Sequence, residues 1–267
     1  KYGAEGKYMF NRENRATIGF GSKFDVMQLG ASLMYDEGIM TPSYGSSGIL
    51  TSGSNASLSF VKQNNLFFSM EPIRNFTVRL DASLQNIISA NPEKFNLDFY
   101  KDNTLKSGLT DFHTTFSLVL QPGAKYVQYG VDRTTLRTLA PTFILKYTHG
   151  FANVLEGDFD YNKLQFLYAQ KILLGNLGKT NVNFEAGKNF DAVPLAIQTI
   201  IPGNQSYFLA FNTFSLLKYY EFVADTYTTM NVEHHFNGKL ISYVPLIKKL
   251  KLRELIFFRG AYGTLSD

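Results

Sequence analysis

Residues 77–85 read TVRLDASLQ and alternate strictly between two kinds of side chain. The odd positions are polar: Thr77, Arg79, Asp81, Ser83 and Gln85. The even positions are apolar: Val78, Leu80, Ala82 and Leu84. Because successive side chains of a β-strand point to opposite faces of its sheet, this stretch predicts a strand with one hydrated and one apolar face. Segments of about ten residues repeat the pattern, a length that suits a tilted membrane-spanning strand.

The alternation is equally clear in 143–148, 181–186 and 222–236, whereas helical periodicity is nearly absent. A soluble β-sandwich would alternate in a similar way, but its outer face is usually richer in Lys and Glu. Here the polar faces consist mainly of Asn, Thr, Ser and Gln with single charges, as expected for the wall of a water-filled lumen. We predict strands over the following ranges: 4–11, 15–24, 26–36, 55–62, 66–70, 76–88, 95–100, 112–120, 125–133, 141–151, 158–174, 179–190, 221–236 and 252–263.

The predicted fold is all-β: an antiparallel transmembrane β-barrel, or most of one, in a single domain over 1–267. Charged residues make up 18% of the chain and aromatic residues 15%, which suits a lipid-facing wall with aromatic girdles, although Trp is absent. No stretch of about 18 apolar residues exists, so spanning a bilayer would require a closed barrel. The chain begins inside strand-like sequence and ends just after an apolar run, so we expect a piece of a longer, processed protein.

Composition and motifs argue against several function classes. The net charge is +4 and the basic residues are scattered apart from a cluster at 248–259, so we expect no nucleic-acid partner. The absence of Cys excludes disulfides and thiolate chemistry. In Glu233-His234-His235 the middle side chain points away from the other two, so the three cannot ligate one metal; we expect no metal and no cofactor. Neither a Gly-x-Ser-x-Gly elbow nor a phosphate-binding glycine loop is present, so we do not expect an enzyme.

Residues 191–220 interrupt the alternation with two apolar pieces around Pro202-Gly203-Asn204-Gln205. The apolar side chains of this segment are Ile200, Ile201, Phe208, Phe211, Phe214, Leu216 and Leu217. So many apolar groups need a surface to bury against. We predict a long loop that folds into the barrel or packs on its rim; the alternative is a long extracellular hairpin.

Polar side chains near this segment are the candidate functional residues. They are expected to line the lumen or anchor the loop: Asp225, Tyr227, Asn231, Glu233, His235, Arg253 and Arg259. We predict that Asp225, Glu233 and His235 form a polar ring with one of the two arginines, because a planar guanidinium suits carboxylates.

Several motifs in 198–263 are distinctive in combination. They are Pro202-Gly203-Asn204, YYEFVAD at 219–225, EHHFNG at 233–238, PLIKKL at 245–250 and Arg253-Glu254. Together with 122–150, this stretch resembles the closing region of a Bacteroidota outer-membrane β-barrel family of unknown function, whose members carry an N-terminal carboxypeptidase-regulatory-like domain before a large barrel. The resemblance covers about the last 150 residues well and the first 110 loosely. It implies that more strands follow Gly263.

The resemblance implies a protein of the bacterial outer membrane that acts as a structural, assembly or transport component of the cell envelope. Its partners would be outer-membrane lipid and other outer-membrane or periplasmic proteins. The order of loop 191–220, strand 221–236 and strand 252–263 is also similar to that of barrels that insert or secrete proteins, although their inward-loop Val-Arg-Gly-type motif is not present. Two alternatives remain open: a passive porin or substrate transporter with an open lumen, and an outer-membrane hydrolase with Ser, His and an acidic group at one rim.

Overall fold

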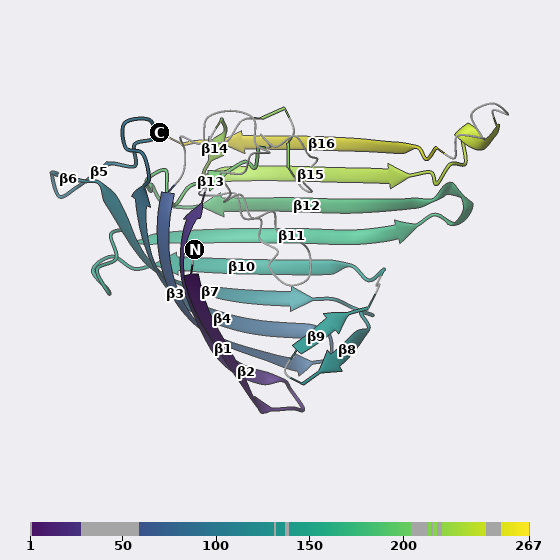
Figure 1. Cartoon of the computed structure of the whole chain (residues 1–267), viewed down its shortest axis with the longest axis horizontal. Helices are drawn as coiled ribbons and strands as arrows, with labels where there is room; N and C mark the ends of the chain where they lie inside the picture. Colours follow the sequence, from purple (N-terminus) through teal and green to yellow (C-terminus); the bar gives the residue numbers. More distant parts are fainter. Residues whose placement is uncertain are drawn as a thin grey trace.

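The computed structural model describes residues 2–27, 59–130, 132–136, 139–203, 213–214, 216–217, 221–243 and 252–266. In these residues a ten-stranded antiparallel sheet, strongly twisted and bent, dominates the fold (Figure 1). Its strands, in spatial order, are β1 (Tyr2–Asn11), β2 (Ala16–Met27), β3 (Ser59–Ile73), β4 (Phe76–Ser89), β7 (Gly108–Leu120), β10 (Thr142–Gly150), β11 (Tyr161–Leu173), β12 (Lys179–Asn189), β15 (Thr226–His235) and β16 (Leu255–Thr264).

Three two-stranded pairs lie outside this sheet. They are β5 (Phe99–Lys101) with β6 (Thr104–Lys106), β8 (Tyr126–Tyr129) with β9 (Asp132–Thr135), and β13 (Thr199–Ile200) with β14 (Val223–Ala224). Two 3-10 turns, η1 (Gly175–Leu177) and η2 (Ile241–Tyr243), complete the regular structure of the described residues. No helix in this part of the chain is long and apolar enough to cross a membrane.

The prediction of an all-β fold with a large antiparallel sheet is confirmed. Closure is not seen: in the described part of the chain β1 and β16 are the two edges of an open sheet. Residues 59–62 and 66–70, predicted in two separate strands, belong to one strand, β3, in which Asn64 accepts a hydrogen bond from the Ser22 hydroxyl at 2.7 Å; residues 55–58 lie outside the described part of the chain. Most of the predicted strand 26–36 lies outside the described residues.

Three other predicted strands are divided or displaced. Segment 95–100 contributes only β5, which pairs with β6 away from the main sheet. Segment 125–133 is the β8–β9 hairpin, which turns at Gly130 with a positive φ of 61°. Segment 221–236 splits at Asp225 into β14 and β15, because β14 leaves the main sheet to pair with β13.

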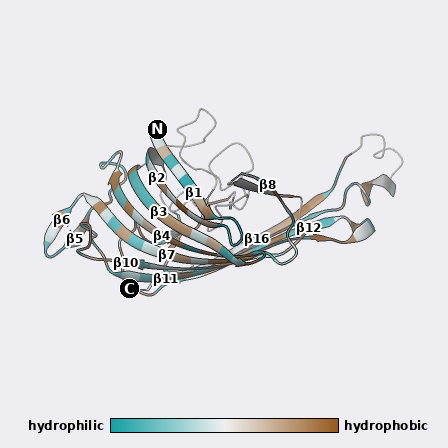
Figure 2. Ribbon diagram, turned by 90° about the horizontal axis from the view of Figure 1, so that it is seen from below, coloured by the Kyte–Doolittle hydropathy of each residue, from teal (hydrophilic) through white to brown (hydrophobic). Residues whose placement is uncertain are grey.

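The outer face of the main sheet is apolar. Rows of direct cross-strand partners show this, one of them running through Met70, Val78, Leu118, Leu145 and Phe166. Partners on adjacent strands share a face, so the row crosses β3, β4, β7, β10 and β11 without a polar interruption. Figure 2 shows the resulting alternation of hydrophobic and hydrophilic bands along the strands.

Large side chains on this outer face are exposed. Leu80 is 50% exposed, Phe116 42% and Phe258 61%. Within the described strands, the charged residues at outward positions, Lys62 and Lys188, lie near strand ends. A wide apolar surface with charges only toward its margins is unusual for a protein surrounded by water.

The inner face is covered by other segments of the chain. Val61, Ile87 and Leu109 are neighbours across β3, β4 and β7, and all three are buried. This hydrophobic cluster is completed by Leu97, just before β5, by Phe99 at the start of β5 and by Ile200 in β13. The core therefore lies between the inner face and segments that fold over it.

Candidate functional site

Two tyrosine–carboxylate networks lie on the inner face. In the first, the hydroxyl of Tyr161 on β11 donates to the Asp111 carboxylate on β7, with both oxygens 3.2 Å away. His113 Nδ1 lies 2.7 Å from Asp111 Oδ2. The Tyr161 ring reaches across β10 because its cross-strand partner there is Gly150, where a Cβ would lie 2.1 Å from the ring. The glycine thus permits a contact between strands that are not adjacent.

The second network repeats this geometry. Tyr227 on β15 lies across Gly187 of β12, where a Cβ would come within 2.5 Å of the ring. The Tyr227 hydroxyl donates to Glu185 Oε1 at 2.6 Å and accepts from Gln165 Nε2 at 2.8 Å. Glu185 is 7% exposed and Tyr227 4%. A buried carboxylate is therefore held by a charge-assisted hydrogen bond.

Lys163 connects the two networks. It lies on β11 between Tyr161 and Gln165, and its ammonium group interacts electrostatically with both Glu185 and Asp111. Lys163, Lys146, Gln165, Glu185, Tyr227 and Thr229 form the floor of a cavity of about 250 Å³. Residues 196–202 form its roof. The inner face therefore contains a polar chamber beneath an apolar cover.

Of the residues expected at the site, Tyr227 lies in this chamber. Asn231 is on the same inner face, between Asn183 of β12 and Arg259 of β16. Glu233 and His235 pair with one another, through Oε1 and Nε2. His234 points outward, where Nδ1 lies 2.8 Å from the Thr180 hydroxyl.

Asp225 precedes β15, and its Oδ2 accepts a hydrogen bond from the Ser266 amide at 2.8 Å. Bonds from Ser266, with a smaller contribution from Thr226, hold the pKa of Asp225 below its ordinary value. Ten residues of extended chain separate Asp225 from His235, or about 30 Å at roughly 3.3 Å per residue. The two side chains therefore lie at opposite ends of the strand.

The predicted polar ring is not found among the described residues. Arg253 is exposed just before β16. Arg259 Nη1 donates to the Thr213 carbonyl at 2.6 Å, and its guanidinium lies 5.2 Å from the centre of the Phe257 ring. Neither arginine forms an ion pair with a carboxylate in the described part of the chain. Arg259 thus contacts the backbone of the loop.

The segment 191–220 folds over the inner face where it is described. Ile200, Ile201 and Phe214 are buried, whereas Leu216 is 96% exposed. Backbone hydrogen bonds hold it: Ile201 N donates to Phe222 O at 3.0 Å, and Phe214 N donates to Pro202 O at 2.9 Å. Phe208 and Phe211 lie outside the described residues.

The Arg259 contact leads to a prediction about this loop. Arg259→Gln removes a hydrogen bond from a charged donor, worth about 1.5–3 kcal/mol. We expect limited proteolysis within 191–217 to become at least about tenfold faster, because local opening follows the stability of the segment. Arg253→Gln, at the exposed arginine, is the matched control. Equal cleavage rates in both variants would show that Arg259 does not anchor the loop.

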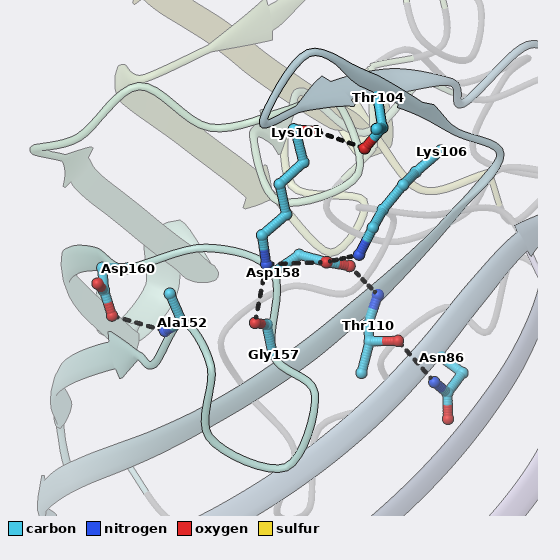
Figure 3. Close-up of polar contacts among 9 residues, drawn as sticks. All are labelled: Asn86, Lys101, Thr104, Lys106, Thr110, Ala152, Gly157, Asp158 and Asp160. Carbon is cyan, nitrogen blue, oxygen red and sulfur yellow. Dashed lines mark hydrogen bonds and ion pairs between the residues drawn. The ribbon is translucent and has the colours of Figure 1, made fainter.

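A third cluster fixes the β5–β6 hairpin to the loop before β11 (Figure 3). Asp158 Oδ1 lies 3.2 Å from Lys101 Nζ and 2.5 Å from Lys106 Nζ, and Oδ2 accepts from the Thr110 amide at 2.8 Å. Burial alone would raise the pKa of Asp158, but the bonds from Lys106, Thr110 and Lys101 outweigh it and hold the pKa below its ordinary value.

This cluster makes stability depend on acid pH. Because the folded pKa of Asp158 is lowered, its contribution is complete at neutral pH and is lost as the pH falls below about 4. We expect Asp158→Asn to lower the free energy of unfolding by about 1.5–3 kcal/mol at pH 7 and to flatten its decline in acid. Denaturant titrations at pH 7 and pH 3 measure both effects. Asp98→Asn, at an exposed carboxylate nearby, should change neither.

Sequence reasoning missed Asp111, Lys163, Glu185 and Asp158. Their positions in the alternation place the first three on the polar face, but nothing local indicates which strands pair. The usable signal was the glycine at 150 or 187 within an otherwise regular strand, which marks a close approach by a large neighbour. In the described residues, no group of three or more His, Asp or Glu side chains could hold a metal ion.

The fold and the inner networks define an all-β protein built on a wide antiparallel sheet, apolar outside and charged inside. Residues 55–264 match the family whose description is "Family of unknown function (DUF5686) C-terminal domain", and the chain belongs to this family. No curated protein matches the chain.

Proposed function

We propose that this chain forms the wall of a β-barrel in the bacterial outer membrane and serves as a structural, assembly or transport component of the envelope. The observation that carries the proposal is the outer face, where apolar side chains such as Leu80 and Phe116 form continuous cross-strand rows and remain exposed. Lipid tails satisfy such a surface, whereas water does not. The outward charges near strand ends suit the level of the lipid headgroups.

The covered inner face favours a filled interior over a passive pore. Ile200 packs with Val61 and Ile87, so the segment around β13 occupies space that an open channel would need. The charged chamber beneath it is closed on one side by residues 196–202. We therefore favour a barrel whose interior is occupied by its own chain, and we place the passive porin second.

The hydrolase alternative has one observation in its favour. Ser83 on β4 lies directly opposite His113, which pairs with Asp111. However, the Ser83 hydroxyl accepts a hydrogen bond from Gln63 at 3.2 Å, and Ser83 is buried. A nucleophile and its base require a hydrogen bond between them. Within the described residues, none joins Ser83 to His113. The arrangement therefore favours a structural polar cluster, and we propose no catalytic activity.

Envelope fractionation tests the proposal. Membranes from cells that make the intact protein are washed with alkaline carbonate and then separated into inner and outer fractions. An integral barrel should stay in the outer-membrane fraction, because its outer face cannot be rehydrated without a large loss of buried apolar surface. Quantitative release into the soluble wash would contradict the proposal.

A further inference from the structure

A patch of polar side chains interrupts the apolar outer face on β2, β3, β4 and β7. Lys62 lies directly opposite Asn86, and Asn86 lies directly opposite Thr110. Asn64, at the next outward position of β3, accepts a hydrogen bond from the Ser22 hydroxyl at 2.7 Å. These five residues are called the polar patch below. Because the rest of this face is apolar, polar groups gathered at one level of it require a polar partner.

The polar patch presents hydrogen-bond donors. Asn86 Nδ2 donates to Thr110 Oγ1 at 3.0 Å, which leaves the proton of that hydroxyl to donate elsewhere (Figure 3). Within the described residues, the Lys62 ammonium forms no ion pair or hydrogen bond, and Asn64 Nδ2 has no acceptor. Neighbouring positions on one face of a sheet are about 5–7 Å apart, so the oxygens of one phosphate group can accept from three of these donors.

The charge of the surroundings favours an anion. No acidic residue stands at an outward position of β2, β4 or β7, or of β3 between Phe60 and Met70. The carboxylate next to Thr110 is Asp158, which accepts from the Thr110 amide. Asp158 is paired with both Lys101 and Lys106, so that cluster carries one excess positive charge and does not repel an anion.

The depth of the polar patch matches the level of lipid phosphates. Lys62 lies eleven residues before Ile73, which ends β3 on the opposite side of the sheet. At about 3.3 Å per residue and a tilt of about 35–45°, this separation is about 26–30 Å along the membrane normal, close to the apolar band of about 25 Å in such barrels. Leu66 and Phe68 lie between the two levels and are 54% and 37% exposed. The polar patch is therefore at the margin of the acyl layer.

The lengths of the connections assign this margin to one leaflet. At the end of the sheet that holds the polar patch, every connection between main-sheet strands has ten residues or more: 28–58, 90–107, 151–160 and 190–225. The other end has two long connections, 121–141 and 236–254, and three tight turns: 12–15, 74–75 and 174–178. Outer-membrane barrels carry longer loops outside and short turns on the periplasmic side, so the polar patch faces the outer leaflet.

We propose that the polar patch binds the phosphate group of an outer-leaflet lipid, with phosphate oxygens at Lys62, Asn64 and Thr110 and acyl chains over Leu66 and Phe68. This inference rests on the proposed function, because it requires a lipid-facing outer surface. The two fail in different ways. Release of the protein from washed membranes removes both, whereas an integral outer-membrane protein that does not recognise the phosphate removes only this site.

Phosphatidic acid is the probe, and its binding to the intact protein in detergent is measured by native mass spectrometry. Diacylglycerol with the same acyl chains lacks the phosphate, so we expect it to bind at least about tenfold more weakly. Millimolar inorganic phosphate should not displace phosphatidic acid, because the acyl chains contribute to the affinity of the lipid. Equal binding of diacylglycerol, or displacement by inorganic phosphate, would overturn the proposal.

Variants of exposed side chains locate the site. Lys62→Met should weaken phosphatidic acid binding at least about tenfold, and Thr110→Val, which removes a neutral donor at nearly constant shape, should weaken it less. Lys188→Met is the matched control: this lysine also faces outward at the same end of the sheet, but its direct partners are Leu164 and Thr226. It should bind like wild type. Unchanged binding in Lys62→Met, or an equal loss in Lys188→Met, would contradict a site at the polar patch.

Discussion

Leu80→Arg is expected to block membrane insertion of the protein, whereas Gln85→Arg on the same strand is expected to be tolerated. Leu80 lies in the apolar outer row with Phe68 and Phe116, and an arginine there would meet acyl chains. A charge at the midplane of a barrel costs about 2–4 kcal/mol. Gln85 lies on the inner face directly opposite Asp111, where a cation has a complementary neighbour.

The measurement is the fraction of each variant found folded in the outer membrane at equal expression. We expect Leu80→Arg to be depleted at least tenfold relative to wild type, while Gln85→Arg stays within about twofold, because about 1.4 kcal/mol corresponds to a factor of ten. If both variants accumulated equally, the outer face would not be the lipid-facing one.

Glu185→Ala is expected to destabilise the protein by about 3–5 kcal/mol, the usual effect of removing one partner from a buried charged network. The substitution leaves the Tyr227 hydroxyl without its acceptor and leaves Lys163 with only one of the two carboxylates, Glu185 and Asp111, that act on it electrostatically. Glu233→Ala is the control on the neighbouring strand. Its pair with His235 lies at side chains that are only 20% and 28% exposed, and it joins a carboxylate to a single imidazole outside the Lys163 network, so it should contribute no more than about 1 kcal/mol.

A double variant tests the physical cause. Adding Lys163→Met to Glu185→Ala removes the uncompensated charge, so it should recover part of the lost stability. Urea midpoints of the intact protein in detergent give all of these values. Destabilisation by Glu185→Ala no larger than by Glu233→Ala, or no recovery in the double variant, would mean that the inner charges are not coupled.

The strands were predictable where the two faces differ in chemistry. The strand predicted over 76–88 corresponds to β4, Phe76–Ser89, and the strand predicted over 179–190 corresponds to β12, Lys179–Asn189. Alternation reports which residues share a face, and this information is local. Segment 221–236 was predicted as one strand because its alternation continues through Asp225, whereas pairing of β14 with β13 divides it.

The candidate site was predictable only in part. Tyr227 was expected on the inner side, and it lies there. Its hydrogen-bond partners could not be predicted from the sequence. Gln165 and Glu185 lie beside Tyr227 only because of the register in which β11, β12 and β15 pair, and local alternation does not specify this register. The polar ring was expected to include Arg253 or Arg259, but in the described residues Arg259 donates to the backbone carbonyl of Thr213, and nothing in the sequence of β16 specifies this contact.

Spin labels at two adjacent residues test the central claim most directly. The chain has no Cys, so Phe116→Cys and Thr115→Cys each give a single labelling site, and the two neighbours on β7 point to opposite faces. In membranes holding the intact protein, a label at 116 should collide often with oxygen, which concentrates in lipid, and rarely with a water-soluble nickel chelate. A label at 115 should show the reverse preference. Nickel accessibility at 116 equal to or above that at 115 would contradict a lipid-facing outer surface.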